Sequence, residues 1–196
     1  NNVFPSMIEG TVAGMAAGLV SQGVVDVRVA ATRSNKLELK LNGDVKHIAL
    51  VDLAVSYERF VGARAIWDMS TLHVVFLCRA EPSSIGLSAI GAQLKPISLG
   101  DGGGVHIEFG DGDGSVLAPV APGMVLPVKI TSWQALNAGD STIVTLRPST
   151  IALDGERTLS LKPSDSASVT LSSDGPLVVD VNKTLRAAAE LGHMRD

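Results

Sequence analysis

The strongest constraint on the fold comes from two short alternating runs that flank a three-residue polar segment. Residues 151–153 and 159–161 each place apolar side chains two positions apart, which is the period of a strand with one buried face. Between them lies Asp154-Gly155-Glu156, in which Gly after Asp allows the positive φ of a tight hairpin turn. The stretch predicts a hairpin that delivers two carboxylates, Asp154 and Glu156, to one edge of a β domain. The plainer interpretation is that it only turns the chain.

Similar short runs recur along the sequence and predict a mainly-β fold. Twenty Gly and nine Pro are spread among them, as is typical of all-β folds with frequent turns. The expectation is one domain over residues 1–196, a multi-stranded layered or sandwich domain whose β core covers about 24–180. The expected strands lie at 25–29, 37–41, 48–55, 73–80, 105–109, 115–118, 125–130, 142–146, 167–171 and 177–179.

One helix is expected at each end of this core. Ser6-Met7-Ile8-Glu9 matches a capping box, so the N-terminal helix is predicted at about 6–22, ending at Gly23. The C-terminal helix is predicted at about 182–191, capped by Gly192, and a short helix is considered at 63–67. Glycines recur four apart in the first helix and indicate close backbone packing: Gly10, Gly14 and Gly18.

Composition excludes several classes of function. A net charge of −4 and 4% aromatic residues argue against nucleic-acid binding, which needs clustered cations or stacking rings. No apolar run reaches membrane-spanning length, so no membrane association is expected. A single Cys78 cannot form an internal disulfide, which fits a reducing, cytoplasmic location.

Two glycine-rich stretches need an interpretation. Gly100–Gly104 and Gly110–Gly114 run between predicted strands without a following helix, so both are interpreted as hairpin loops rather than phosphate cradles. Asp111 and Asp113 lack the remaining ligands of a calcium loop. The four histidines show no paired spacing with Cys or carboxylates, and no metal site is predicted.

Further information comes from the order of five segments: Asn1-Asn2-Val3-Phe4-Pro5, Ala49-Leu50-Val51-Asp52, Glu81-Pro82-Ser83-Ser84-Ile85-Gly86-Leu87-Ser88, Ala118-Pro119-Val120-Ala121-Pro122 and Leu153-Asp154-Gly155-Glu156. In this order they resemble motifs in the C-terminal half of NAD kinases and their relatives. The similarity is greatest to the acetoin-catabolism protein X group.

The resemblance implies the fold of the second domain of NAD kinases and a role in nucleotide or dinucleotide binding. By resemblance, Asn1 and Asn2 lie near phosphates, and a second set contacts ribose or base: Asp52, Ser83, Ser84, Gly86 and Ser88. Asp154 and Glu156 become the catalytic candidates, as a general base or a holder of metal-bound water. For the intact protein the resemblance implies ATP and Mg²⁺, NAD as a candidate substrate, and a homo-oligomer.

This sequence also departs from the kinase pattern. Val51 replaces the Asn of the ribose-binding pair, and the Ser83–Ser88 loop has no Tyr, which puts NAD specificity in doubt. The Gly-Gly-Asp-Gly-Thr phosphate loop is absent, and the chain does not begin with Met, so it is expected to be part of a longer protein. Alone, it is not expected to transfer phosphate.

Three hypotheses follow. The chain is the C-terminal domain of an NAD-kinase-like enzyme, or a non-catalytic nucleotide-binding or regulatory module linked to acetoin breakdown. Alternatively, it is mainly an oligomerisation domain.

Overall fold

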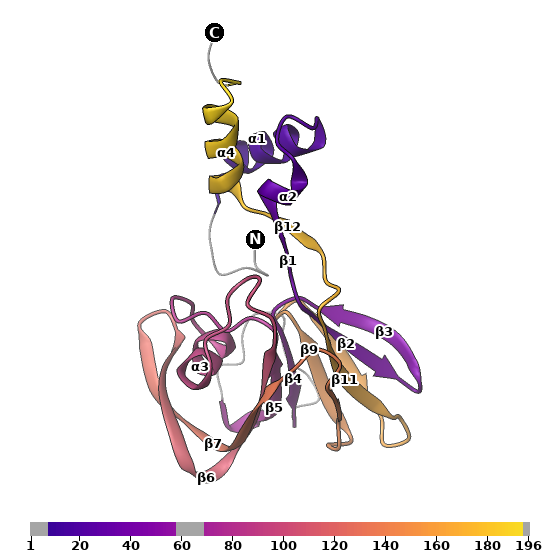
Figure 1. Cartoon of the computed structure of the whole chain (residues 1–196). Coiled ribbons are helices and arrows are strands. Elements are labelled where there is room, and N and C mark those ends of the chain that lie inside the picture. The colour runs from indigo at the N-terminus through magenta and orange to yellow at the C-terminus, as the bar shows by residue number, and fades with distance from the viewer. Residues whose placement is uncertain (1–7, 58–68, 194–196) are drawn as a thin grey trace.

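The computed structural model describes residues 8–57 and 69–193, apart from the side chain of Lys46. Asn1, Asn2 and the short helix considered at 63–67 lie outside the described residues. The described part is mainly β, as predicted, with three antiparallel sheets (Figure 1). Its strands are β1 (Ala31–Arg33), β2 (Lys36–Leu41), β3 (Asp44–Ala49), β4 (Asp52–Ser56), β5 (Leu72–Leu77), β6 (Gly104–Ala121), β7 (Met124–Leu136), β8 (Ser141–Ile143), β9 (Ser149–Leu153), β10 (Arg157–Leu161), β11 (Ala167–Ser172) and β12 (Leu177–Val179).

The β core is built in layers around a six-stranded sheet. Its order is β10-β9-β4-β5-β6-β7, and a four-stranded sheet of order β3-β2-β11-β8 accompanies it. One cluster of buried residues joins strands of both sheets, among them Leu39, Phe76 and Leu153. A second cluster joins the six-stranded sheet to helix α3 (Leu87–Leu94) and includes Val75 and Ile90. The six-stranded sheet therefore contributes to both apolar clusters.

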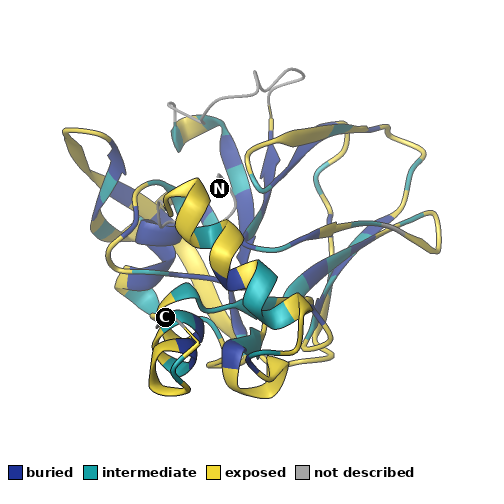
Figure 2. Cartoon of the chain, turned by 90° about the horizontal axis from the view of Figure 1, so that it is seen from above, coloured by how far each residue is buried: buried dark blue, intermediate teal, exposed yellow. Residues whose placement is uncertain are grey.

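Three helices form a separate helical unit: α1 (Gly10–Ser21), α2 (Val27–Ala30) and α4 (Val181–Glu190). The two-stranded ribbon β1–β12 connects this unit to the β core, and Figure 1 shows it standing clear of the sheets. Its buried cluster contains only Val25, Ala30 and Ala188. Figure 2, seen from above, shows how much of the helices is exposed.

Turns with a strong local signal are confirmed. Asn42 and Gly43 take positive φ values of 52° and 93° between β2 and β3. Asp154 and Gly155 do the same between β9 and β10, at 53° and 67°. Asn and Gly tolerate this region better than other residues, so the local sequence suffices to place these turns.

The predicted helix ends are confirmed in part. Gly23 follows α1 with φ 72° and Gly192 follows α4 with φ 79°, in the expected capping positions. The N-terminal helix starts later than the capping box suggested. Its cap is Glu9, whose carboxylate accepts hydrogen bonds from the N–H groups of Thr11 and Val12. A carboxylate suits this position because it meets the unpaired N–H groups of the first turn.

Two predictions from apolar alternation are wrong. No strand forms at 25–29. Residues 27–30 form the helical turn α2 instead, because the Asp26 side chain accepts a hydrogen bond from the Arg28 N–H (2.8 Å) and caps that turn. The single strand expected at 48–55 is broken into β3 and β4, which belong to different sheets.

Three loop predictions are also wrong. The loop expected at 79–91 contains helix α3. Gly110–Gly114 is a bulge inside β6 rather than a hairpin loop, because Phe109 and Gly114 both register with Ile130 of β7. Gly100–Gly104 leads from an isolated bridge at Ile97 into β6, so it is not a hairpin loop either.

Candidate functional site

The hairpin β9–β10 carries Asp154 to the point where β3 passes into β4. Residue 154 follows β9 directly, and its N–H donates to the Asp52 carbonyl (3.0 Å). The two aspartates are 102 residues apart in sequence. Antiparallel pairing of β9 with β4 is what brings them together. We call this place the aspartate corner and define it by Leu50, Val51, Asp52, Asp154 and Arg157.

Both oxygens of the Asp154 carboxylate are engaged. Oδ1 accepts hydrogen bonds from the N–H groups of Leu50 (2.9 Å) and Val51 (2.8 Å), and Oδ2 pairs with Arg157 (3.3 Å). Arg157 also donates to the Ile48 carbonyl (2.6 Å). The Asp154 side chain is only 5% exposed. This carboxylate therefore anchors the crossover between the two sheets.

Asp52 has a different environment. It is half-buried at the start of β4, and its carboxyl oxygens accept no hydrogen bond from the described residues. Burial, and secondly the neighbouring Asp154 carboxylate, raise the pKa of Asp52 to about 7. Near neutral pH this carboxyl group can therefore accept or donate a proton.

The only cysteine also lies near this corner but is shielded. The Cys78 thiol is buried and lies 3.6 Å from the Val51 carbonyl oxygen. Burial, followed by the charges of Asp154 and Asp52, raises the pKa of this thiol well above its usual range. A protonated, buried thiol is a poor nucleophile, so Cys78 is part of the core.

The second catalytic candidate does not share the corner. Glu156 is exposed at the hairpin tip, and its side chain contacts no described residue through a hydrogen bond or ion pair. The structure therefore separates the two predicted carboxylates, one buried and engaged and one in solvent.

The predicted ribose-binding loop is held by its own hydrogen bonds. Ser84 is buried and donates to the Glu81 carbonyl (2.7 Å), while the Ser88 hydroxyl accepts from the Glu81 N–H (2.9 Å). Gly86, with φ 77°, donates its N–H to the Pro119 carbonyl (2.8 Å). Among the predicted residues of this loop, Ser83 is the exposed one. Most of these groups therefore shape the loop and the start of α3.

A buried ion pair beside this loop was missed from the sequence. Arg79 is 9% exposed and contacts Glu81 at 2.9 Å, and the other Glu81 oxygen accepts from the Ser98 hydroxyl (3.1 Å). An Arg and a Glu two positions apart after an apolar strand are the only local signal for it. Such a pair fixes the chain that leaves β5, since an unpaired buried charge would be costly.

Comparison with known proteins identifies the family. Residues 35–174 match the family described as the acetoin catabolism protein X C-terminal domain. The acetoin catabolism protein X of Cupriavidus necator is 38% identical over 202 residues, covering 100% of this chain and 56% of that relative.

The chain belongs to the acetoin catabolism protein X family.

The family match confirms the part of the predicted resemblance that concerned this group. It includes Asp52, Asp154 and the whole Ser83–Ser88 loop within residues 35–174, whereas α1 and α4 lie outside it. The chain spans 56% of the relative's length, so activities of the complete relative extend to this family member only as proposals. The finer likeness to NAD kinases stays a prediction.

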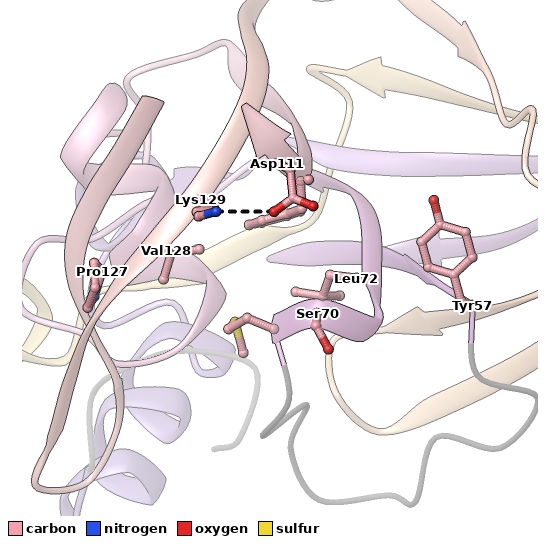
Figure 3. A pocket seen from close by; sticks show the side chains of 10 residues that line it. Tyr57, Ser70, Leu72, Asp111, Pro127, Val128 and Lys129 are labelled. Carbon is pink, nitrogen blue, oxygen red and sulfur yellow. Dashed lines mark hydrogen bonds and ion pairs between the residues drawn. The ribbon is translucent and has the colours of Figure 1, made fainter. Parts of the chain in front are cut away.

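Figure 3 shows a second place of interest, a cavity of about 400 Å³. Its lining includes Tyr57, which follows the last residue of β4, whereas Asp52 is the first residue of that strand. Tyr57, Leu72 and Phe109 line the cavity, and an ion pair of Lys129 with Asp111 (3.1 Å) lies beside them. The Tyr57 hydroxyl shares a hydrogen bond with His73 Nδ1 (3.0 Å). None of the predicted site residues that the structure describes lines the cavity. The sequence held no signal for it, because its walls come from four separate segments.

The described residues do not by themselves fit Mg²⁺ or a triphosphate. Among them no group of three or more His, Cys, Asp or Glu side chains could hold a metal ion. Asp154 is already engaged, which leaves Asp52 as the one free carboxylate of the aspartate corner. Likewise, neither glycine-rich stretch opens a helix N-terminus that would cradle phosphate.

No helix in the part of the family member that the structure describes is both long and apolar enough to cross a membrane.

Proposed function

We propose that this chain is a nucleotide- or dinucleotide-binding domain of an acetoin catabolism protein X family member, and that Asp52 recognises a ligand hydroxyl. The observation that carries this proposal is the Asp52 carboxyl group, half-buried at a sheet crossover and free of hydrogen-bonding partners among the described residues. A carboxylate held in this way suits the vicinal hydroxyls of a ribose, because it can accept two hydrogen bonds.

This proposal gives the predicted site residues that the structure describes distinct roles. Asp154 is a positioning residue, because it holds the turn that presents Asp52. Ser83 and Glu156 are exposed and free to contact a ligand, whereas Ser84, Gly86 and Ser88 maintain the shape of the loop. Phosphoryl transfer to NAD or a related acceptor would need a phosphate-binding domain that supplies ATP and Mg²⁺.

A second candidate function is nucleotide binding without transfer, as a regulatory module of acetoin breakdown. It is supported by the engaged Asp154 carboxylate, which is poorly placed to act as a base, and by Val51 at the position of the expected Asn. Cytoplasmic location, by resemblance and from the single cysteine, remains part of both proposals.

Calorimetric titration with NAD, ATP and ADP tests the proposal. We expect one of these ligands to bind, and Asp52→Asn to weaken its binding by about tenfold, or roughly 1.4 kcal/mol, as one lost charged hydrogen bond would do. Asp113→Asn, which removes an equal charge from the β6 bulge, is the matched control and should leave binding unchanged. Absence of binding by all three ligands at millimolar concentration would refute the nucleotide assignment.

Turnover separates the two candidates. Phosphorylated NAD formed by the longer protein with ATP and Mg²⁺ supports the kinase, whereas binding without product supports the regulatory module.

A further inference from the structure

Helix α1 has the composition of a buried helix. Its 12 residues contain no charged side chain, and Thr11 and Ser21 are its only polar ones. A helix that is apolar on every side is normally enclosed by the rest of the protein. In this structure, however, Ala16 is the only residue of α1 that is buried.

One side of α1 is largely exposed. At 100° per residue, Ala16, Leu19 and Val20 share the side that packs within the helical unit. The opposite side, which we call the open face, contains the half-buried Gly18 and six exposed residues: Gly10, Thr11, Gly14, Met15, Ala17 and Ser21. A Cβ atom placed on Gly10 or Gly14 would meet nothing within 4 Å, so a second backbone can approach closely there.

The neighbouring helix α4 shows what a solvated helix of this unit looks like. Thr184 and Ala188 are buried, while Lys183, Arg186 and Glu190 are exposed. Charges cover the outer side of α4, and no charge covers the open face of α1. The two helices were therefore selected for different surroundings.

The length of the relative indicates what covers the open face. This chain accounts for 56% of the Cupriavidus necator protein, and the remainder is long enough for a further domain of about 100–150 residues. A second copy fits less well. One face of a three-turn helix, with Met15 as its only large side chain, buries far less than the roughly 800 Å² per partner of a stable dimer, whereas a covalently linked domain docks at high effective concentration.

We propose that the open face of α1 docks against an apolar surface of a further domain in the same polypeptide, with its glycines allowing close backbone contact. The helical unit then joins two domains instead of completing the β core. This inference does not depend on the proposed nucleotide binding.

The substitution Gly14→Leu tests this docking proposal. It should preserve or raise the stability of the 196-residue chain but weaken domain docking in the longer polypeptide. In the 196-residue chain the side chain enters open space and improves helix propensity, so the melting temperature should stay equal or rise. In the longer polypeptide from the same gene the same side chain should separate the domains. Hydrogen exchange should show α1 amides protected at least tenfold more in the longer wild-type protein than in the 196-residue chain, and Gly14→Leu should abolish that difference.

Two controls accompany the measurement. Amides of β9, inside the β core, should exchange equally in all samples and report that the fold is intact. Ala189→Leu adds the same kind of side chain to the exposed side of α4 and should leave α1 protection unchanged.

Three outcomes would overturn the proposal. One is equal α1 protection in the short and long chains. Another is a gene that encodes no further domain. The third is a dimer of the 196-residue chain in analytical ultracentrifugation that Gly14→Leu dissociates, which would assign the open face to a second copy.

Discussion

The β core and the helical unit of this chain differ in how they are held together. The β core contains two clusters of sixteen buried residues each, on which three layers pack. The helical unit has an apolar cluster of only three buried residues, and a two-stranded ribbon connects it to the core. The hydrophobic effect scales with buried apolar area, so nearly all the stability of the chain resides in the β core.

Two kinds of exposed surface therefore coexist in one chain. Exposed residues of the β core near Asp52 lie on sheets that are stabilised by their own buried apolar clusters. Those of α1 belong to a unit with almost no core of its own, and their apolar character is explained by a contact partner. Mutations in the two regions should therefore differ in their effects on stability.

The largest loss of stability is expected from a mutation that removes a buried side chain from the β core. Phe76 is 1% exposed and stacks on His106 with ring centroids 4.6 Å apart. Phe76→Ala should cost about 3–5 kcal/mol of unfolding free energy, because the space cannot close in a well-packed interior. Urea unfolding followed by circular dichroism measures this cost. Val25→Ala in the helical unit should change the unfolding free energy of the main transition by no more than about 1 kcal/mol. If it lost as much stability as Phe76→Ala, the conclusion that the β core holds nearly all the stability would be wrong.

A smaller effect is expected where the two sheets join. Asp154→Gly keeps the backbone freedom that φ 53° requires but leaves the Leu50 and Val51 N–H groups without their acceptor. The expected loss is about 3 kcal/mol, measured by the same unfolding experiment. Glu156→Gly makes a matched change at the exposed position of the same turn. If both variants lose equal stability, the anchoring role of Asp154 is wrong.

Asp52 gives the β core a pH dependence opposite in sign to that of the helical unit, where hydrogen bonds lower the pKa values of Glu9 and Asp26. Its pKa is raised to about 7 in the folded chain, against about 3.9 in an unfolded one, so between these values the folded state binds more protons. Its contribution therefore favours folding at low pH and is lost as pH rises to about 7. Asp52→Asn should stabilise the chain by about 2 kcal/mol at pH 8 and by almost nothing at pH 4. Melting temperatures of both proteins across this range provide the check, and an effect independent of pH would contradict it.

The smallest effect is expected in the helical unit. Gly18→Ala places a methyl group where nothing lies within 4 Å and should stabilise α1 by about 1 kcal/mol. Slower hydrogen exchange of α1 amides, without a change in the β core, would be the result. Faster exchange in the 196-residue chain would mean that Gly18 already faces a neighbour.

Local chemistry made part of this molecule predictable. Turns at Asn42-Gly43 and Asp154-Gly155 follow from residues that tolerate positive φ, and α4 follows from its pattern and its glycine cap. The alternation of apolar residues predicted the wrong structure where an aspartate side chain accepted hydrogen bonds from backbone N–H groups. Asp26 turned one expected strand into a helix, and Asp154 broke another from 102 residues away.

The amino-acid sequence alone predicts a mainly-β chain of the acetoin catabolism protein X group with Asp154 at a hairpin tip, because strand period and turn chemistry are local properties. The fold is needed to show that the Asp154 carboxylate is hydrogen-bonded while the Asp52 carboxyl group accepts no hydrogen bond from the described residues, and that Ser84 and Ser88 bond to their own loop. It likewise decided that α1, apolar on every side, remains uncovered. These outcomes depend on which distant segments pair and which groups they bury, and no short pattern of residues encodes that.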